Sequence, residues 1–287
     1  MKFSFKPSGA LYIILCCLAW SFAGVLSKWA PWGAYSIIGA RSLLTALVFA
    51  FKRKSFKPVF TRGNWIGAFG VAATSALFII ANKMTSAANA IVLQYAMPVV
   101  VILGYWVFQG KKPSLLDAGI GLSVMLGVVL CFMSGFRRGA FLGDTLALLS
   151  AFTFALVFFA ARMKDADPTD YAYLGNLLCS LFLIAIPFDP DFTLSISALI
   201  PVVLMGVCLS LGYLFFSMGM KAGVHPVTAS ILANVEPVMN PFWAFLFLGE
   251  NPGALSLFGA ALVLFSVSLY SVLKPRQDRH KALVADG

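Results

Sequence analysis

Residues 90–113 read AIVLQYAMPVVVILGYWVFQGKKP, and residues 229–252 read ASILANVEPVMNPFWAFLFLGENP. The two stretches align without a gap at an offset of 139 residues (229 minus 90). Identical residues occupy the pairs Ala90/Ala229, Leu93/Leu232, Pro98/Pro237, Phe108/Phe247, Gly110/Gly249 and Pro113/Pro252. The offset continues through Leu116/Leu255, Val124/Val263 and Leu130/Leu269. Prolines and a glycine in register indicate an internal duplication of the chain.

The composition is that of a membrane protein. Of the 287 residues, 60% are hydrophobic and 11% are charged, with a mean hydropathy of +0.90. A soluble domain carries roughly 25% charged residues. The polar residues separate apolar runs that approach the ~20 residues an α-helix needs to cross a bilayer. Backbone amides in lipid must bond within their own segment, so the runs are predicted to be helices.

Ten such runs can be delimited, and they predict an all-α integral membrane protein with ten transmembrane helices. They are Ser8–Ser27, Gly33–Phe51, Gly63–Ala81, Thr85–Gly110, Ala118–Phe136, Thr145–Ala161, Tyr171–Phe188, Phe192–Met220, Ala222–Gly249 and Pro252–Leu273. Only Arg41, His225 and Glu236 interrupt them with a basic, imidazole or carboxyl side chain.

The duplication divides the chain into two five-helix repeats, at residues 1–136 and 137–273, followed by a tail at 274–287. A weaker match at an offset of 134 pairs Gly9 with Gly143 and Leu15 with Leu149. Because each repeat has an odd number of spans, the second enters the membrane from the opposite side. Inverted repeats around a central cavity are typical of transporters that work by alternating access. A duplication that only makes a stable helical bundle is the alternative.

The basic residues predict the orientation. With the N-terminus inside, most of the 21 Lys and Arg residues lie on the inner side. These are Lys2, Lys6, Lys52, Arg53, Lys54, Lys57, Arg62, Lys111, Lys112, Arg162, Lys164, Lys221, Lys274, Arg276, Arg279 and Lys281. The outer side receives Lys28, Lys83, Arg137 and Arg138. The positive-inside rule therefore places both termini in the cytoplasm.

Several short motifs resemble one transporter superfamily. They are Cys17-Leu18-Ala19-Trp20-Ser21, Ala40-Arg41-Ser42, Gln94-Tyr95-Ala96-Met97-Pro98, Asn234-Val235-Glu236-Pro237 and Leu248-Gly249-Glu250. Together with the repeat length they resemble the drug/metabolite transporter superfamily with its EamA-type repeats, from about Gly9 to Leu273.

Within that superfamily, the sequence looks most similar to bacterial aromatic amino acid exporters of the YddG type. The resemblance implies a ten-helix exporter of the cell inner membrane that takes amino acids out of the cytoplasm through a central cavity. One departure is that Met97 stands in the first repeat where the second has Glu236, so the two halves cannot share a carboxylate role.

Glu236 lies near the middle of its run, where a charge facing lipid costs at least ~2.5 kcal/mol. We therefore expect it to face a cavity or a partner, with Asn240 one turn later on the same helix face. Glu236 is predicted to bind a substrate ammonium group or to exchange a proton. The alternative is a structural Glu-Pro element whose carboxylate bonds a neighbouring helix.

Pro98 and Pro237 remove a backbone donor at equivalent positions of the two repeats and free a carbonyl one turn earlier. They are predicted to be hinges, the alternative being helix kinks without a functional role.

The other candidate substrate-binding residues are polar or aromatic. Gln94 shares a helix face with small and flexible residues, which suits a cavity wall. Trp20, Phe78, Tyr213 and Trp243, with Phe154, could line a pocket for large or aromatic solutes. Arg41 could bind a substrate carboxylate, pair with Asp144 or Glu236, or extend to the membrane surface.

The sequence predicts no metal site and no cofactor, because it has neither metal-ligand spacing nor a glycine-rich phosphate loop. The five cysteines lie inside apolar runs and suit packing. The charges lie in loops, which argues against nucleic acid. The expected partners are a small-molecule substrate, an amino acid by the resemblance, and membrane lipids, and the protein is expected to be a monomer.

The sequence thus predicts a secondary transporter and not an enzyme. An exporter of cationic drugs or other small metabolites on the same scaffold is the main alternative, since Glu236 would also suit a cation. A membrane-embedded transferase acting on lipid substrates, or a channel or scaffold, is a more remote one.

The orientation can be tested by labelling. A cysteine at Lys57 should react with a membrane-impermeant thiol reagent only from the cytoplasmic side, because the basic loop 52–62 is retained there. Labelling from the outside would show that the orientation is the opposite one, while the predicted number of helices would be unaffected.

Overall fold

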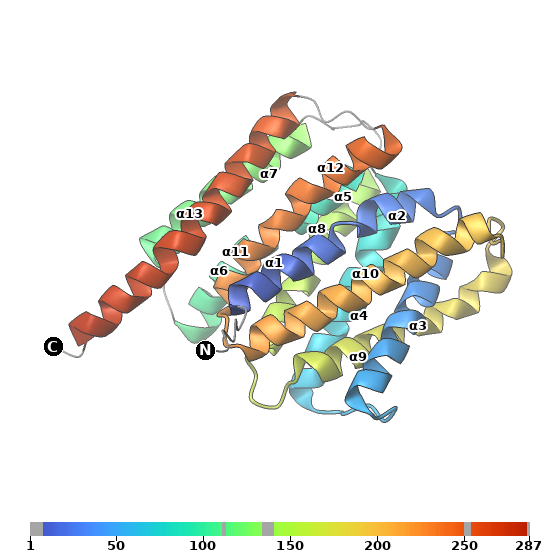
Figure 1. The fold of residues 1–287 in the computed structure, drawn as a ribbon, viewed down its shortest axis with the longest axis horizontal. Coiled ribbons are helices and arrows are strands. Elements are labelled where there is room, and N and C mark those ends of the chain that lie inside the picture. The colour runs from blue at the N-terminus through green and yellow to red at the C-terminus, as the bar shows by residue number, and fades with distance from the viewer. Residues whose placement is uncertain (1–7, 86, 111–112, 134–140, 250–253, 286–287) are drawn as a thin grey trace, which may run out of the picture.

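The computed structural model describes residues 8–85, 87–110, 113–133, 141–249 and 254–285. These residues form helices and connecting loops, with no strand among them. The helices are α1 (Gly9–Trp20), α2 (Ala23–Trp29), α3 (Ala34–Arg53), α4 (Arg62–Met84), α5 (Ala87–Gln94), α6 (Met97–Gln109), α7 (Leu115–Met133), α8 (Phe141–Ala160), α9 (Pro168–Ser180), η1 (Leu181–Phe188), α10 (Ile196–Lys221), α11 (Pro226–Leu232), η2 (Ala233–Val235), α12 (Glu236–Leu248) and α13 (Ala254–Ala285) (Figure 1).

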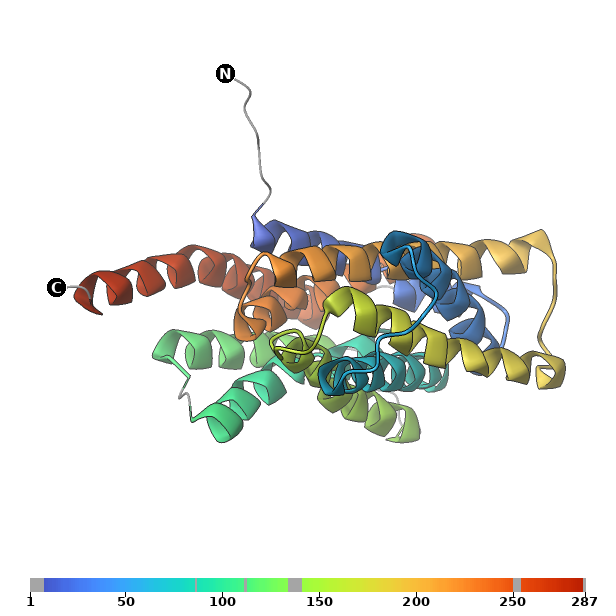
Figure 2. The same cartoon turned by 90° about the horizontal axis from the view of Figure 1, so that it is seen from below.

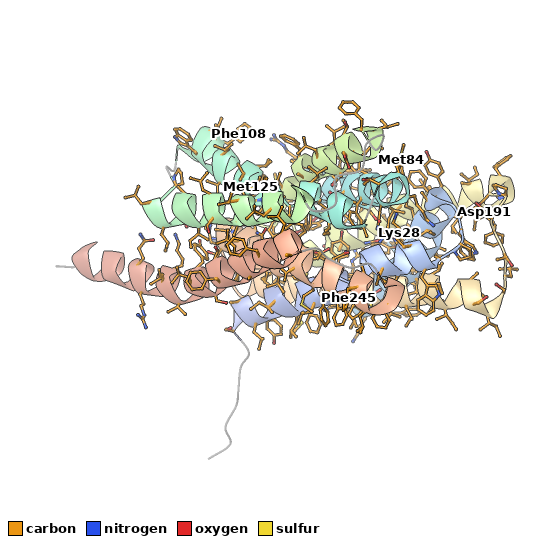
Figure 3. All side chains as sticks on the ribbon, turned by 90° about the horizontal axis from the view of Figure 1, so that it is seen from above. Lys28, Met84, Phe108, Met125, Asp191 and Phe245 are labelled. Atoms are coloured by element: carbon orange, nitrogen blue, oxygen red, sulfur yellow. The ribbon has the colours of Figure 1, made fainter. Side chains whose placement is uncertain are left out.

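Six helical stretches in the described chain are long and apolar enough to cross a membrane. They are Gly9–Trp29, Ala34–Arg53, Arg62–Met84, Phe141–Ala160, Pro168–Phe188 and Ile196–Lys221. Large apolar side chains cover the outside of the bundle, as Phe108 and Phe245 illustrate (Figure 3). Phe108 is 85% exposed, which is unfavourable in water and favourable in lipid. The all-helical membrane class predicted from the sequence is therefore confirmed.

Three of the predicted apolar runs are interrupted within their length by a turn or a short 3-10 turn, and a fourth, Tyr171–Phe188, passes from α9 into the longer 3-10 helix η1. The first breaks between α1 and α2 at residues 21–22, the second between α5 and α6 at residues 95–96, and the third at the 3-10 turn η2. Pro98 and Pro237 occupy the first turns of α6 and α12. A proline at that position needs no backbone hydrogen bond, so both helices restart without a lost donor.

Helix α4 packs extensively against α8 and also against α9. The long α13 lies beside α7 at one edge of the bundle and extends beyond it (Figures 1 and 2). Ser123 and Ser266 form a hydrogen bond of 2.8 Å between these two helices. The start of α1 and the end of α13 point to the same end of the bundle, in the lower left of Figure 1.

Ion pairs connect α9 with α3 and α10 near the end of the bundle where α1 begins. Arg53 Nε lies 2.5 Å from Asp170 Oδ1, and its guanidinium lies 4.5 Å from the centroid of the Tyr173 ring. Lys221 Nζ lies 2.7 Å from Asp167 Oδ2, while Asp167 Oδ1 accepts the first-turn N–H of Thr169 at 2.7 Å.

Asp167 titrates in a loop outside the membrane-spanning segments. Burial alone would raise the pKa of Asp167, but the hydrogen bonds from Lys221 and Thr169 lower it below the usual Asp value. The stabilisation is therefore fully present above the usual Asp pKa and is lost as the pH falls through the lowered pKa.

Substitution of Asp167 separates the helix cap from the ion pair. Asp167→Ala should lower the free energy of unfolding by about 1 kcal/mol, because α9 loses its N-cap acceptor. Asp167→Asn keeps an acceptor and should cost less, since both partners of the ion pair are 40% or more exposed. Thermal unfolding in detergent at neutral pH measures both, and equal losses would mean that the charge and not the cap stabilises this end.

Candidate functional site

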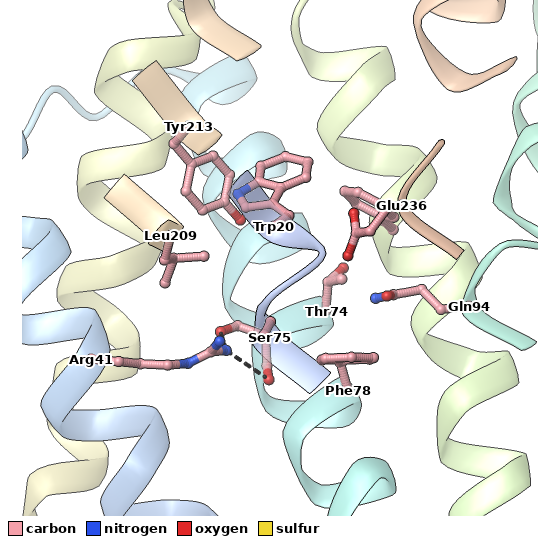
Figure 4. A pocket seen from close by; sticks show the side chains of 11 residues that line it. Trp20, Arg41, Thr74, Ser75, Phe78, Gln94, Leu209, Tyr213 and Glu236 are labelled. Carbon is pink, nitrogen blue, oxygen red and sulfur yellow. Dashed lines mark hydrogen bonds between the residues drawn. The ribbon is translucent and has the colours of Figure 1, made fainter. Parts of the chain in front are cut away.

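A cavity of about 50 Å³ lies where the three interrupted helices meet. It is lined by Trp20, Ala23, Arg41, Thr74, Ser75, Phe78, Gln94, Phe154, Leu209, Tyr213 and Glu236 (Figure 4). Trp20 is the last residue of α1 and Ala23 the first of α2, while Gln94 ends α5 and Glu236 begins α12. Every one of the three helix breaks therefore contributes a residue to the cavity wall.

Six of the eight predicted substrate-binding residues line this cavity: Trp20, Arg41, Phe78, Gln94, Tyr213 and Glu236. Asn240 and Trp243 are not among the lining residues. The amide of Asn240 lies against Gly24, and the Trp243 ring stacks on Phe22 at 4.5 Å between centroids. The Trp243 indole N–H also donates to the Ser21 hydroxyl at 2.8 Å, so Trp243 holds the first helix break from outside the cavity.

One wall of the cavity is aromatic. The Trp20 ring meets Tyr213 edge-on at 5.0 Å and Phe154 at 5.7 Å between centroids. Gly212 permits this packing, since a Cβ at that position would overlap the indole nitrogen of Trp20. The buried Trp20 N–H has no hydrogen-bond partner among the described atoms. The wall thus combines a large apolar area with an unused donor.

Glu236 provides the acidic group of the cavity. Its Oε2 accepts a hydrogen bond of 2.5 Å from the hydroxyl of Tyr95, which is fully buried in the break between α5 and α6. As the first residue of α12, Glu236 also lies at the positive end of that helix dipole. The carboxylate therefore has a structural partner and faces the cavity at the same time (Figure 4).

Arg41 provides the positive pole. It extends from α3 to α4 (Figure 4), where one terminal nitrogen donates to Ser75 Oγ at 2.5 Å and to the Ser75 carbonyl at 3.4 Å. Arg41 is 3% exposed, so it does not extend to the surface. Its Nε has no partner, and no carboxylate in the described part of the chain pairs with it. Asp144, considered as a partner from the sequence, accepts from Thr85 instead.

Sequence reasoning missed four lining residues, namely Ala23, Thr74, Ser75 and Leu209. Thr74 and Ser75 are adjacent hydroxyl residues inside an apolar run, and this pattern could have identified them as cavity residues from the sequence. Thr74 donates or accepts a 2.8 Å hydrogen bond with Thr153, which joins α4 to α8. No group of three His, Cys, Asp or Glu side chains within the described residues could hold a metal ion.

Comparison with known proteins gives a family and a fold. The model of the EamA-like transporter family matches residues 7–133 and 141–272, which are the two halves of the chain. A solved structure, described as the crystal structure of a protein, superimposes with a TM-score of 0.75 at 17% identity. The match covers 92% of this chain and 97% of that chain, so the two share the whole fold. No curated protein matches the sequence.

The contact between Gly212 and Trp20 can be tested by adding one methyl group. Gly212→Ala should lower stability by about 1–3 kcal/mol, because the added Cβ forces the indole out of its site. Gly119→Ala is the matched control, since nothing lies within 4 Å of the added Cβ. Thermal unfolding with both variants checks the contact, and equal stability would contradict this packing of Trp20.

Proposed function

The chain belongs to the EamA-like transporter family, and on this basis we propose that it is a secondary transporter that exports amino acids, preferably large or aromatic ones, across the bacterial inner membrane. The observation that carries the substrate class is that Arg41 and Glu236 line one aromatic cavity without pairing with each other. Members of this family are transporters and not enzymes.

The two poles suit a zwitterion. A substrate carboxylate would accept from the unpaired Arg41 Nε. A substrate ammonium would donate to Glu236, and a large side chain would lie against Trp20 and Tyr213. Each buried polar group that is unpaired in the empty cavity costs about 1–3 kcal/mol, so a zwitterion that pairs them gains that amount.

The cavity in this conformation is too small for such a substrate. Its volume of about 50 Å³ is far below the ~300–1,000 Å³ of ligand pockets. Binding therefore requires the walls to separate, and the three helix breaks are the places where the backbone can bend. Pro98 and Pro237 are proposed as hinges, because each lies in the first turn of the helix that follows a break.

The proposed architecture has ten transmembrane helices as two inverted five-helix repeats. It is supported by the two family segments and by the equivalent breaks before α6 and α12. The three shorter apolar helices at Met97–Phe108, Leu115–Gly127 and Ala261–Lys274, together with the interrupted segment α11–η2–α12, would complete the ten spans. Alternating access, with both termini in the cytoplasm, follows from this symmetry and from the positive-inside rule. We propose that the monomer transports.

A second candidate is export of cationic drugs or metabolites on the same scaffold. The buried carboxylate of Glu236 favours it, because a carboxylate attracts any cation. The buried guanidinium of Arg41, which has no carboxylate partner among the described residues, argues against it, since a cation in a small cavity would be repelled by a second positive charge.

Flux into proteoliposomes that contain only this protein tests the proposal. Labelled phenylalanine or tryptophan should enter with saturable kinetics. Arg41→Gln and Glu236→Gln should each reduce kcat/KM by about tenfold or more, the loss expected when a buried charged group loses its partner. Arg162→Gln and Asp191→Asn, which remove charges away from the cavity, are the matched controls and should transport like the wild type.

The outcomes separate the mechanisms. Flux that does not saturate indicates a channel, and saturable flux of cationic drugs without amino acid flux supports the second candidate. We expect Glu236 to act as an ammonium ligand. A pH gradient that accelerates wild-type flux but not the residual flux of Glu236→Gln would instead assign it a proton-carrying role.

A further inference from the structure

The half-helices α2 and α12 lead away from the cavity in the same direction. The first residue of α2, Ala23, and the first residue of α12, Glu236, both line the cavity. From there both helices run toward the upper right of Figure 1, and they lie in contact. The contact between them therefore separates the cavity from the end of the bundle that carries Lys28 and Lys83.

This contact is unusually close and leaves polar atoms unpaired. A Cβ on Gly24 would lie 2.5 Å from Asn240 Oδ1 and 2.8 Å from Asn240 Cγ, so only glycine allows α2 to approach. Asn240 is fully buried, and neither its Oδ1 nor its Nδ2 has a hydrogen-bond partner. Because both atoms are unpaired, exchanging them by a flip of the amide changes nothing. A buried polar atom without a partner is unfavourable, so each of the two destabilises the closed contact.

The contact of α2 with α4 holds several hydrogen bonds, although Asn82 Oδ1 has no partner. Asn82 Nδ2 donates to Ser27 Oγ at 2.7 Å. Lys28 of α2 donates to the Thr85 carbonyl at the end of α4 at 2.7 Å, and Lys83 of α4 donates to the Ala30 carbonyl at the end of α2 at 2.9 Å. Each lysine thus caps the C-terminal end of the other helix, which joins α2 to α4 as one unit.

The opposite end of the bundle is closed by charged pairs. Arg53 with Asp170, and Lys221 with Asp167, connect α9 to α3 and α10. Gly9 packs directly against the region of Val224 and Gly219 at the same end. These charged groups have partners, whereas the Asn240 amide between α2 and α12 has none, so the two contacts differ in cost.

We propose that the contact between Gly24 and Asn240 is the gate through which solute leaves the cavity toward the Lys28 and Lys83 end. On opening, α2 and α4 move as a unit away from α12, and water pairs with the freed Asn240 amide. The Trp243 contacts with Ser21 and Phe22 close the gate next to the cavity and separate in the same step. That the moving species is a solute rests on the proposed function, but the movement itself does not.

A cross-link across the gate tests the proposal. Gly24→Cys with Asn240→Cys places two thiols at the close approach, and oxidation should abolish flux until dithiothreitol restores it. Ser27→Cys with Asn82→Cys is the matched control, because it cross-links α2 to α4 within the moving unit. Its oxidation should leave flux unchanged. Flux through the oxidised Gly24/Asn240 pair, or loss of flux in the oxidised Ser27/Asn82 pair, would overturn the proposal.

A second measurement needs no substrate. The Asn240→Cys protein in proteoliposomes should react with a charged, membrane-impermeant thiol reagent. Its labelling should exceed that of the wild-type protein, in which only the native cysteines can react. Oxidation of the Gly24/Asn240 pair should abolish this reaction. A cysteine at 240 that stays unreactive in folded protein would overturn the gate. If labelling succeeds while no amino acid is transported, the proposed function fails and the gate stands.

Discussion

The hydrogen bond from Tyr95 to Glu236 connects the two helix breaks on which the rest of the structure depends. Tyr95 lies between α5 and α6, and Glu236 begins α12 directly after η2. An interrupted helix in apolar surroundings exposes backbone and side-chain polar groups that lipid cannot satisfy. Because the two breaks lie together, the Tyr95 hydroxyl of one break bonds the Glu236 carboxyl group of the other. The carboxylate is thereby held at the edge of a cavity and not in lipid.

The same constraint explains why the cavity is polar at two points and aromatic elsewhere. Arg41 is held by Ser75 on one side, and Glu236 by Tyr95 on the other. Arg41 and Glu236 do not pair with each other, so both remain available to a solute that carries an ammonium and a carboxylate close together. The closed conformation leaves the Trp20 N–H, the Arg41 Nε and the Asn240 amide unpaired. These unpaired groups raise the free energy of the closed, empty state and favour movement toward states in which substrate or water pairs them.

Much of this arrangement follows from the sequence. The apolar runs predicted the helical membrane class. The repeat predicted that Pro98 and Pro237 occupy equivalent positions, and in the structure both follow helix breaks. The break at residues 21–22 contains no proline and arises where Trp243 bonds Ser21, a contact between segments 222 residues apart.

Helical periodicity placed Asn240 on the same helix face as Glu236. It cannot tell which neighbouring helix covers that face at Asn240, where the structure places Gly24 of α2. For the same reason the partner of Arg41 was not predictable. Ser75 reaches it only through the packing of α3 on α4, whereas Asp144 and Glu236 were the chemically obvious choices.

The central claim is that one cavity binds both charges of a zwitterion. It is tested most directly by equilibrium binding of phenylalanine to the purified protein, compared with phenethylamine, which lacks the carboxylate, and 3-phenylpropionate, which lacks the amine. The account predicts that phenylalanine binds at least about tenfold more tightly than either, a difference of roughly 1.4 kcal/mol. Phenethylamine binding as tightly as phenylalanine, with no loss in Arg41→Gln, would contradict it.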